Sequence, residues 1–142
     1  MNVGRKLAIT AIAVTLAALS ATAQAGRVKW KMHSAWGSSV PHLGTSAWRF
    51  AENIGRMSGG DFTVKAYEPG ALIPANEGFD ATSKGSIEMA WTTAGYDTGK
   101  YPALAFFTAV PFGPSIGEYM AWMKFGGGNE LEAEIYGAHG IH

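Results

Sequence analysis

The stretch "VKWKMHSAW", residues 28–36, sets the architecture of this chain because two kinds of side chain alternate along it. Val28, Trp30 and Met32 fall on one face of an extended chain, and the lysines between them fall on the other, together with His33. This alternation with a period of two predicts a β-strand with one buried face. Because His33 lies on the polar side of the pattern, we expect a partly solvated ring near the end of the strand.

A helix is expected next. Pro41 suits the first turn of a helix, and Gly59-Gly60 provides a left-handed stop. Between them, apolar residues recur at steps of four and three, which is typical of a helix with one buried face. The residues of this apolar stripe are Leu43, Ala47, Phe50, Ile54 and Met57.

The pattern of strand followed by helix then repeats. Residues 61–67, "DFTVKAY", alternate again and predict a second strand, and residues 75–84 predict a short helix capped by Gly85. Residues 87–92 predict a third strand, and the apolar run "FFTAV" at residues 106–110 predicts a buried fourth strand. Strands that alternate with helices indicate an α/β fold with a mostly parallel sheet flanked by helices.

The stretch "AVPFGPSIGEYMAWMKFGGG", residues 109–128, predicts a turn and a capped helix. Ser115 and Glu118 have the spacing of a capping box, in which each side chain bonds the backbone of the other residue. The three glycines 126–128 are expected to stop this helix, and Asn129 is expected to cap another one.

The first 25 residues have the pattern of a secretory signal peptide. Arg5 and Lys6 precede an apolar run over residues 7–19, and Ala21 to Ala25 offer small residues for cleavage. The alternative, a membrane anchor, needs a longer apolar run than this one. We therefore expect the protein to be exported to the periplasm.

The net charge and the cysteine content of the sequence exclude some classes of function. Without residues 1–25, nine Lys and Arg oppose eleven Asp and Glu, a net charge of −2. This charge argues against a nucleic-acid partner, which requires a basic face. Cysteine is absent from the sequence, which excludes thiol catalysis, disulfides and zinc sites built from cysteine.

Aromatic residues follow several of the predicted strands. Ligands of parallel sheets bind beyond the carboxyl ends of the strands, and Trp36, Tyr96 and Phe112 occur at these positions. They are the candidate substrate-binding residues. A core role is the alternative for each of them, because most aromatic side chains are buried in cores.

Two other kinds of site have weaker support. Ser38 and Ser39 follow a strand and could belong to a small exported serine hydrolase, but no base is indicated to activate them. His139 and His142 could share a helix face, but two ligands leave a zinc site incomplete. The sequence thus predicts no catalytic residue, no metal site and no cofactor.

Three stretches carry a resemblance to a known family. They are "WKMHSAW", the run from "RFAENIGRMSGGDF" to "EMAWTTAGY", and "FFTAVPFGPSIGEYMAWMKFGGG". Together they resemble the substrate-binding proteins of tripartite ATP-independent periplasmic (TRAP) transporters, in particular the branch that binds 2-oxo acids and related organic carboxylates. The resemblance covers essentially all of residues 28–136.

The resemblance implies a periplasmic binding protein with two α/β lobes and no enzymatic activity. A small carboxylate would be held between the lobes and delivered to membrane permease subunits, and contact with membrane proteins would be transient. Residues 26–128 would form the N-terminal lobe, and residues 129–142 would begin the crossover to a second lobe. In the family, the arginine that pairs with the carboxylate lies in that second lobe, so we expect the chain to be an N-terminal fragment that lacks tight binding.

Overall fold

A computed structural model describes residues 26–142, and the predicted signal peptide lies outside the described residues. Three strands, β1 (Val28–Ser34), β2 (Phe62–Tyr67) and β3 (Met89–Trp91), form a parallel sheet in the order β2-β1-β3. Val28 pairs with Phe62 at one end, and Met32 pairs with Met89 where β3 joins. The predicted α/β class with a parallel sheet is confirmed.

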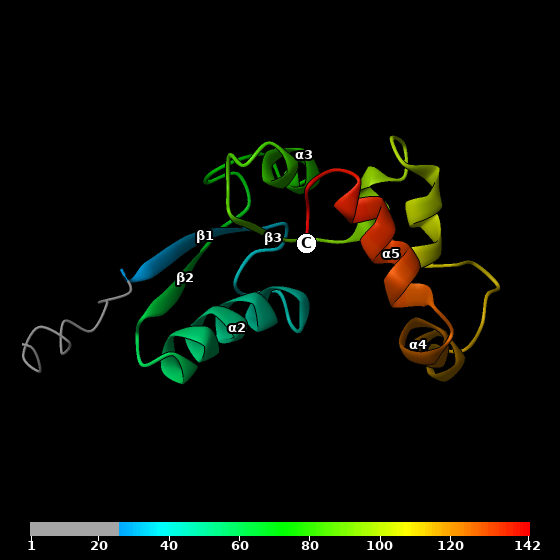
Figure 1. The fold of residues 1–142 in the computed structure, drawn as a ribbon, viewed down its shortest axis with the longest axis horizontal. Helices are drawn as coiled ribbons and strands as arrows, with labels where there is room; N and C mark the ends of the chain where they lie inside the picture. The colour runs from blue at the N-terminus through cyan, green and yellow to red at the C-terminus, as the bar shows by residue number, and fades with distance from the viewer. Residues whose placement is uncertain (1–25) are drawn as a thin grey trace, which may run out of the picture.

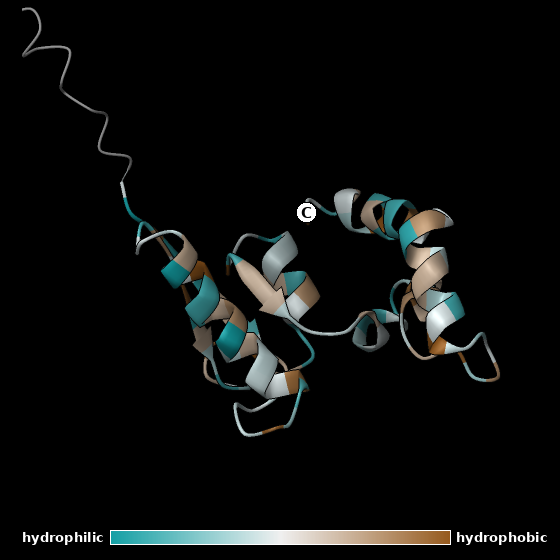
Figure 2. Cartoon of the chain, turned by 90° about the horizontal axis from the view of Figure 1, so that it is seen from below, coloured by the Kyte–Doolittle hydropathy of each residue, from teal (hydrophilic) through white to brown (hydrophobic). Residues whose placement is uncertain are grey.

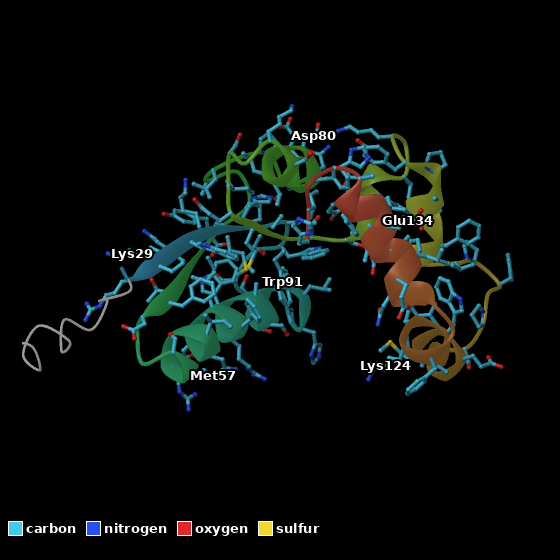
Figure 3. The ribbon with its side chains drawn as sticks, viewed as in Figure 1. Lys29, Met57, Asp80, Trp91, Lys124 and Glu134 are labelled. Atoms are coloured by element: carbon cyan, nitrogen blue, oxygen red, sulfur yellow. The ribbon has the colours of Figure 1, made fainter. Side chains whose placement is uncertain are left out.

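Helix α2 (Leu43–Met57) covers one face of the sheet (Figure 1). Met32 of β1 and Ala47 of α2 are fully buried against each other, and Ala51 and Val64 complete this first core cluster. Figure 3 places Trp91 between the sheet and α2, and its indole Nε1 donates a 2.9 Å hydrogen bond to the carbonyl of Leu43. The periodicity of the sequence therefore predicted the helix correctly and its buried face in part, because Ala47, Phe50 and Ile54 pack in this cluster whereas Leu43 and Met57 are exposed.

Glycine ends α2 as the sequence predicted. Gly59 and Gly60 have positive φ angles of 61° and 88°. The Gly60 N–H donates to the carbonyl of Gly55 at 2.9 Å, and the Gly59 N–H donates to that of Arg56 at 3.3 Å. These two bonds form a Schellman motif, in which left-handed residues satisfy the last carbonyls of a helix.

The opposite face of the sheet carries α3 (Gly78–Ser83) and the loop that precedes it (Figure 1). This loop places the carbonyl of Ala75 3.3 Å from Nε2 of His33, and the His33 ring is 0% exposed. The expectation of a solvated His33 is therefore wrong. Alternation assigned the residue to the correct face, but it could not reveal that a later loop covers that face.

The C-terminal part of the chain is helical and lies at one end of the sheet (Figure 1). It comprises two 3₁₀ helices, η1 (Ala94–Asp97) and η2 (Pro102–Phe107), and two α-helices, α4 (Ile116–Phe125) and α5 (Gly128–Gly137). A second core cluster, with Phe79, Ala94 and Leu104 buried, joins this part to α3. In Figure 2 brown, hydrophobic segments appear on these C-terminal helices.

The predicted fourth strand at residues 106–110 is wrong. Phe106 and Phe107 end η2, and the residues that follow belong to no strand. Pro102 starts η2 with the fixed φ angle that suits a first helical turn. The fully buried side chain of the segment is Leu104, whereas Phe106 is largely exposed. A short apolar run does not by itself distinguish a strand from a helix.

The predicted capping box is present. The Glu118 N–H donates to Oγ of Ser115 at 3.4 Å, and the Ser115 N–H donates to the Glu118 carboxylate at 2.9 Å. Gly126 and Gly127 separate α4 from α5, as expected, whereas Gly128 is already the first residue of α5. The expected cap at Asn129 is wrong, because Gly127, with a φ of 90°, takes the N-cap position of α5.

None of the helices within residues 26–142 has both the length and the apolar character needed to cross a membrane.

Candidate functional site

Trp36 and Tyr96 come together at the carboxyl ends of β1 and β3. Their ring centroids lie 6.1 Å apart, and the ring planes are tilted by 35°. Tyr96 is 47% exposed and Trp36 is partly buried, so the pair presents aromatic surface to solvent. The strand-end rule selected both residues as candidates, and the structure places their rings next to each other.

The backbone around Trp36 is held by short-range hydrogen bonds. The Ser34 hydroxyl donates to the carbonyl of Trp36 at 2.7 Å and accepts from its N–H at 3.3 Å. The Ala35 N–H donates to the carbonyl of Trp91 at 3.0 Å, which ties this loop to β3. The Glu68 carboxylate, which follows β2, accepts from the N–H of Ser38 at 3.0 Å. All three strand ends thus help to fix the position of Trp36.

Helix η1 positions Tyr96. Its N-cap residue Thr93 accepts a 3.3 Å hydrogen bond from the Gly95 N–H and shares a 3.3 Å hydrogen bond with the Thr108 hydroxyl. A Cβ atom on Gly95 would lie only 3.0 Å from Oγ1 of Thr108. Glycine therefore permits the close approach of two segments that fixes the turn carrying Tyr96.

Phe112 does not join this pair. It has a φ of 57°, its side chain is fully exposed, and it lies in the turn between η2 and α4. Throughout the part of the chain that the structure describes, its ring makes no aromatic contact with Trp36 or Tyr96. A non-glycine residue in this left-handed region is uncommon and is strained unless surrounding contacts hold it.

The aromatic pair can hold the planar or apolar part of a small ligand, but it supplies no positive charge. Within residues 26–142 the one cation–π contact joins Lys65 to Tyr67 on β2, not to either ring of the pair. A carboxylate requires a charge-assisted donor for tight binding, typically arginine. The pair thus offers shape and stacking, without a charged group of its own.

Within residues 26–142, neither the serines Ser38 and Ser39 nor the histidines His139 and His142 have the geometry of a catalytic or metal site. The hydroxyls of Ser38 and Ser39 make no hydrogen bond to a histidine or carboxylate among residues 26–142. The His139 ring instead packs on aromatic rings, with its centroid 4.5 Å from that of Tyr101 and 5.4 Å from that of Phe79. Over the same residues, no three His, Asp or Glu side chains are grouped as a metal site would require.

Sequence reasoning missed several residues that shape this region. Ser34 sits inside a strand pattern, where a serine gives no sign that it locks the next turn. Asp97 follows Tyr96 in "GYDTGK", which is typical of an exposed turn, yet it is only 4% exposed. The cause is the packing of α5 and α3 around η1, which has no local signal.

The sequence profile of the bacterial extracellular solute-binding proteins, family 7, matches residues 33–142. This chain belongs to that family. Among curated proteins it is similar to a monocarboxylate 2-oxoacid-binding periplasmic protein from Nostoc sp., with 35% identity over 133 residues. That match covers 91% of this chain and 36% of the Nostoc protein.

Solved structures of TRAP solute-binding proteins have the same fold. One from Colwellia psychrerythraea, with bound calcium and pyruvate, is 32% identical with a TM-score of 0.76, over 80% of this chain and 35% of that one. One from Bordetella bronchiseptica, with calcium and picolinate in one copy, is 29% identical with a TM-score of 0.73, over 80% of this chain and 34% of that one. The chain of this family member thus spans about a third of the length of the proteins it matches.

Proposed function

We propose that this chain is the first-lobe part of an exported TRAP solute receptor that captures a small organic carboxylate of the 2-oxo acid type. Residues 26–128 form the lobe, and residues 129–142 begin the crossover to a second lobe. The receptor carries out no covalent chemistry and delivers its ligand to membrane permease subunits from the periplasm.

The observation that carries this proposal is the Trp36–Tyr96 pair at the carboxyl ends of two parallel strands. Two relatives, identical to this chain at about a third of the aligned positions, are named for a 2-oxo acid ligand or contain pyruvate. Both support a ligand that is small, planar and negatively charged. Phe112, exposed in the turn before α4, would meet the ligand or the second lobe upon closure.

The chemistry of the described residues suggests which part of the receptor orients the ligand and which part supplies the positive charge. Trp36 and Tyr96 exclude water from one side of the ligand and fix the plane of its carbon skeleton. An arginine of the second lobe supplies the charge, since the aromatic pair has none. Capture of the ligand therefore requires both lobes. The residues described here contribute more to the orientation of the ligand than to its affinity.

A chimera tests this proposal. Residues 26–142 replace the matching third of the Colwellia pyruvate-binding protein, and pyruvate binding is measured by calorimetry and tryptophan emission. We expect the folded chimera to bind pyruvate, and we expect Trp36→Ala and Tyr96→Ala each to weaken binding at least about tenfold, the equivalent of about 1.4 kcal/mol.

Trp122→Ala is the matched control, because Trp122 is a partly buried tryptophan of α4 that stacks on Phe107 and not on the candidate pair. A folded chimera that binds neither pyruvate nor any other 2-oxo acid of a panel would refute the ligand class. Binding that is unchanged by both ring deletions would refute the assigned residues.

A further inference from the structure

Glu68 lies at the carboxyl end of β2, beside the loop that carries Trp36. Its carboxylate accepts a 3.0 Å hydrogen bond from the N–H of Ser38. One residue earlier in that loop, a Cβ atom added to Gly37 would lie 3.4 Å from the same carboxylate oxygen, Oε2. Because Gly37 follows Trp36 directly in the chain, these two contacts place the Glu68 charge next to the backbone of Trp36.

A tight turn fixes the backbone of Glu68. The Ala71 N–H donates to the carbonyl of Glu68 at 3.0 Å, and Gly70 between them has a positive φ of 80°. Proline at the second position and glycine at the third are the pattern of a type II β-turn over residues 68–71. An exposed glutamate ordinarily samples several rotamers, whereas this one is held both at its backbone and at its carboxylate.

The charge of Glu68 is not neutralised by the residues around it. In the part of the chain that the structure describes, the one salt bridge joins Lys100 to Asp80, so Glu68 pairs with no lysine or arginine. Its side chain is exposed, and its second oxygen, Oε1, accepts no hydrogen bond from residues 26–142. A ligand beside Trp36 would therefore lie near an uncompensated negative charge.

The other residues at the strand ends do not offset this charge. The segments that directly follow the three strands contain acidic residues but neither lysine nor arginine, and they are residues 35–42, 68–77 and 92–99. Lys100, which comes next, donates to Asp80 at 2.6 Å instead. Like charges repel, and the repulsion between partly exposed charges acts over about 10 Å at moderate ionic strength. These strand ends thus offer nothing that attracts a second carboxylate.

We propose that Glu68 is a specificity-determining residue, which excludes 2-oxo acids that carry a second, distal carboxylate. The inference rests on the proposed function, in which the first carboxylate pairs with an arginine of the second lobe. The remaining carbon chain of the ligand then lies against the Trp36–Tyr96 pair, on the side where Glu68 is held. An apolar tail is indifferent to this charge, whereas a distal carboxylate is repelled by it.

Two ligands of equal size isolate the effect of charge. The acid 5-methyl-2-oxohexanoate has the carbon chain of 2-oxoglutarate, with an isopropyl group in place of the distal carboxylate. Both are measured by calorimetry on the folded chimera that contains residues 26–142. We expect the branched acid to bind at least about tenfold more tightly than 2-oxoglutarate, and Glu68→Gln to reduce this preference at least about fivefold. Glutamine still offers an oxygen to the Ser38 N–H, so this variant removes only the charge.

Asp61→Asn is the matched control, because Asp61 is an exposed acidic residue just before β2, at the opposite end of the strand from Glu68. It removes the same charge roughly 20 Å away along the strand and should leave the preference unchanged. Glu68→Lys reverses the charge and should lower the preference further than Glu68→Gln. Added salt should also lower the preference of the original chimera, since exposed charges are screened, and this measurement needs no variant to fold.

Three results would overturn the role of Glu68. The first is an equal preference in the original chimera and in Glu68→Gln. The second is rejection of the branched acid as strong as that of 2-oxoglutarate, which would show that size decides. The third is loss of pyruvate binding in Glu68→Gln, which would show that Glu68 supports binding. A folded chimera that binds no 2-oxo acid refutes the proposed function as well, whereas pyruvate binding without a charge preference refutes only the role of Glu68.

Discussion

The sheet region, residues 26–92, and the helical region, residues 93–142, bury their apolar residues to different extents. Helix α2 buries Ala47 and Ala51 against the sheet, whereas α4, of mostly apolar sequence, has no buried residue. The helical region leaves many large apolar side chains exposed, namely Phe106, Val110, Phe112, Ile116, Met120, Phe125 and Leu131. The apolar face of the sheet is thus covered mainly by residues of the sheet region itself, chiefly those of α2. The apolar residues of the helical region have the character of a contact surface.

The largest expected effect comes from a matched pair of methionines. Met32 is fully buried in the first core cluster, and Met120 of α4 is 44% exposed. Met32→Ala should lower the free energy of unfolding by about 2–5 kcal/mol, because it leaves a cavity. Met120→Ala should change it by less than about 0.5 kcal/mol. Urea unfolding followed by far-ultraviolet circular dichroism measures both, and equal losses would contradict the contrast between the two regions.

A pair of glycines in α2 tests how closely the sheet region is packed. A Cβ atom on Gly44 would lie 1.8 Å from the carbonyl oxygen of Gly37, whereas one on Gly55 would meet nothing within 4 Å. We expect Gly44→Ala to lower the free energy of unfolding by about 1–3 kcal/mol through overpacking.

The control, Gly55→Ala, should raise the same free energy by about 0.5–1 kcal/mol, because alanine is the better helix former. Thermal unfolding of the two variants side by side gives the comparison. If both variants were stabilised, the turn at Gly37 could not be packed against the start of α2.

The capping box tests the independence of the helical region. Ser115→Ala removes the N-cap of α4 and should cost that helix about 1 kcal/mol. Because α4 has no buried residue, the loss should appear as faster amide exchange within residues 116–125, with exchange in α2 unchanged. An equal increase in α2 would show that the two regions unfold as one unit.

The smallest effect concerns pH. Burial raises the pKa of Asp97 above its ordinary value of 3.8, so the folded chain binds this proton more tightly than the unfolded chain. Stability should therefore decline as pH rises from about the ordinary value through the raised pKa. Asp97→Asn should remove this decline, and Asp61→Asn should not. A urea-midpoint series between pH 4 and pH 7 compares them, and parallel curves for all three proteins would contradict the assignment.

The sequence was informative where local signals decide the structure. Alternation, the apolar stripe of α2, the glycine stops and the Ser115–Glu118 box each depend on residues a few positions apart. The elements themselves were confirmed, but their buried faces only in part, because Val28 and Trp30 of β1 and Leu43 and Met57 of α2 are exposed. The rule that ligand sites lie at strand ends selected Trp36 and Tyr96, whose rings are neighbours in the structure, and their role in binding stays a prediction.

It failed where distant segments decide burial. His33 is covered by a loop some forty positions later, which alternation cannot report. The apolar run at residues 106–110 forms no strand: Phe107 packs against the second core cluster, whereas Phe106 and Val110 are exposed. The environment of Asp97 likewise arises from α3 and α5, which meet only in the folded chain.

The lack of buried residues in α4 also has a consequence for the durability of the chain. A protease requires an extended, accessible backbone, and a helix without buried residues opens more readily than one packed into a core. Lys124 is an exposed basic residue near the end of α4 (Figure 3), whereas Arg49 and Arg56 lie on the well-packed α2. Trypsin should therefore make its first cut after Lys124. As long as no other surface covers α4, proteolysis within its ten residues should limit the lifetime of the chain.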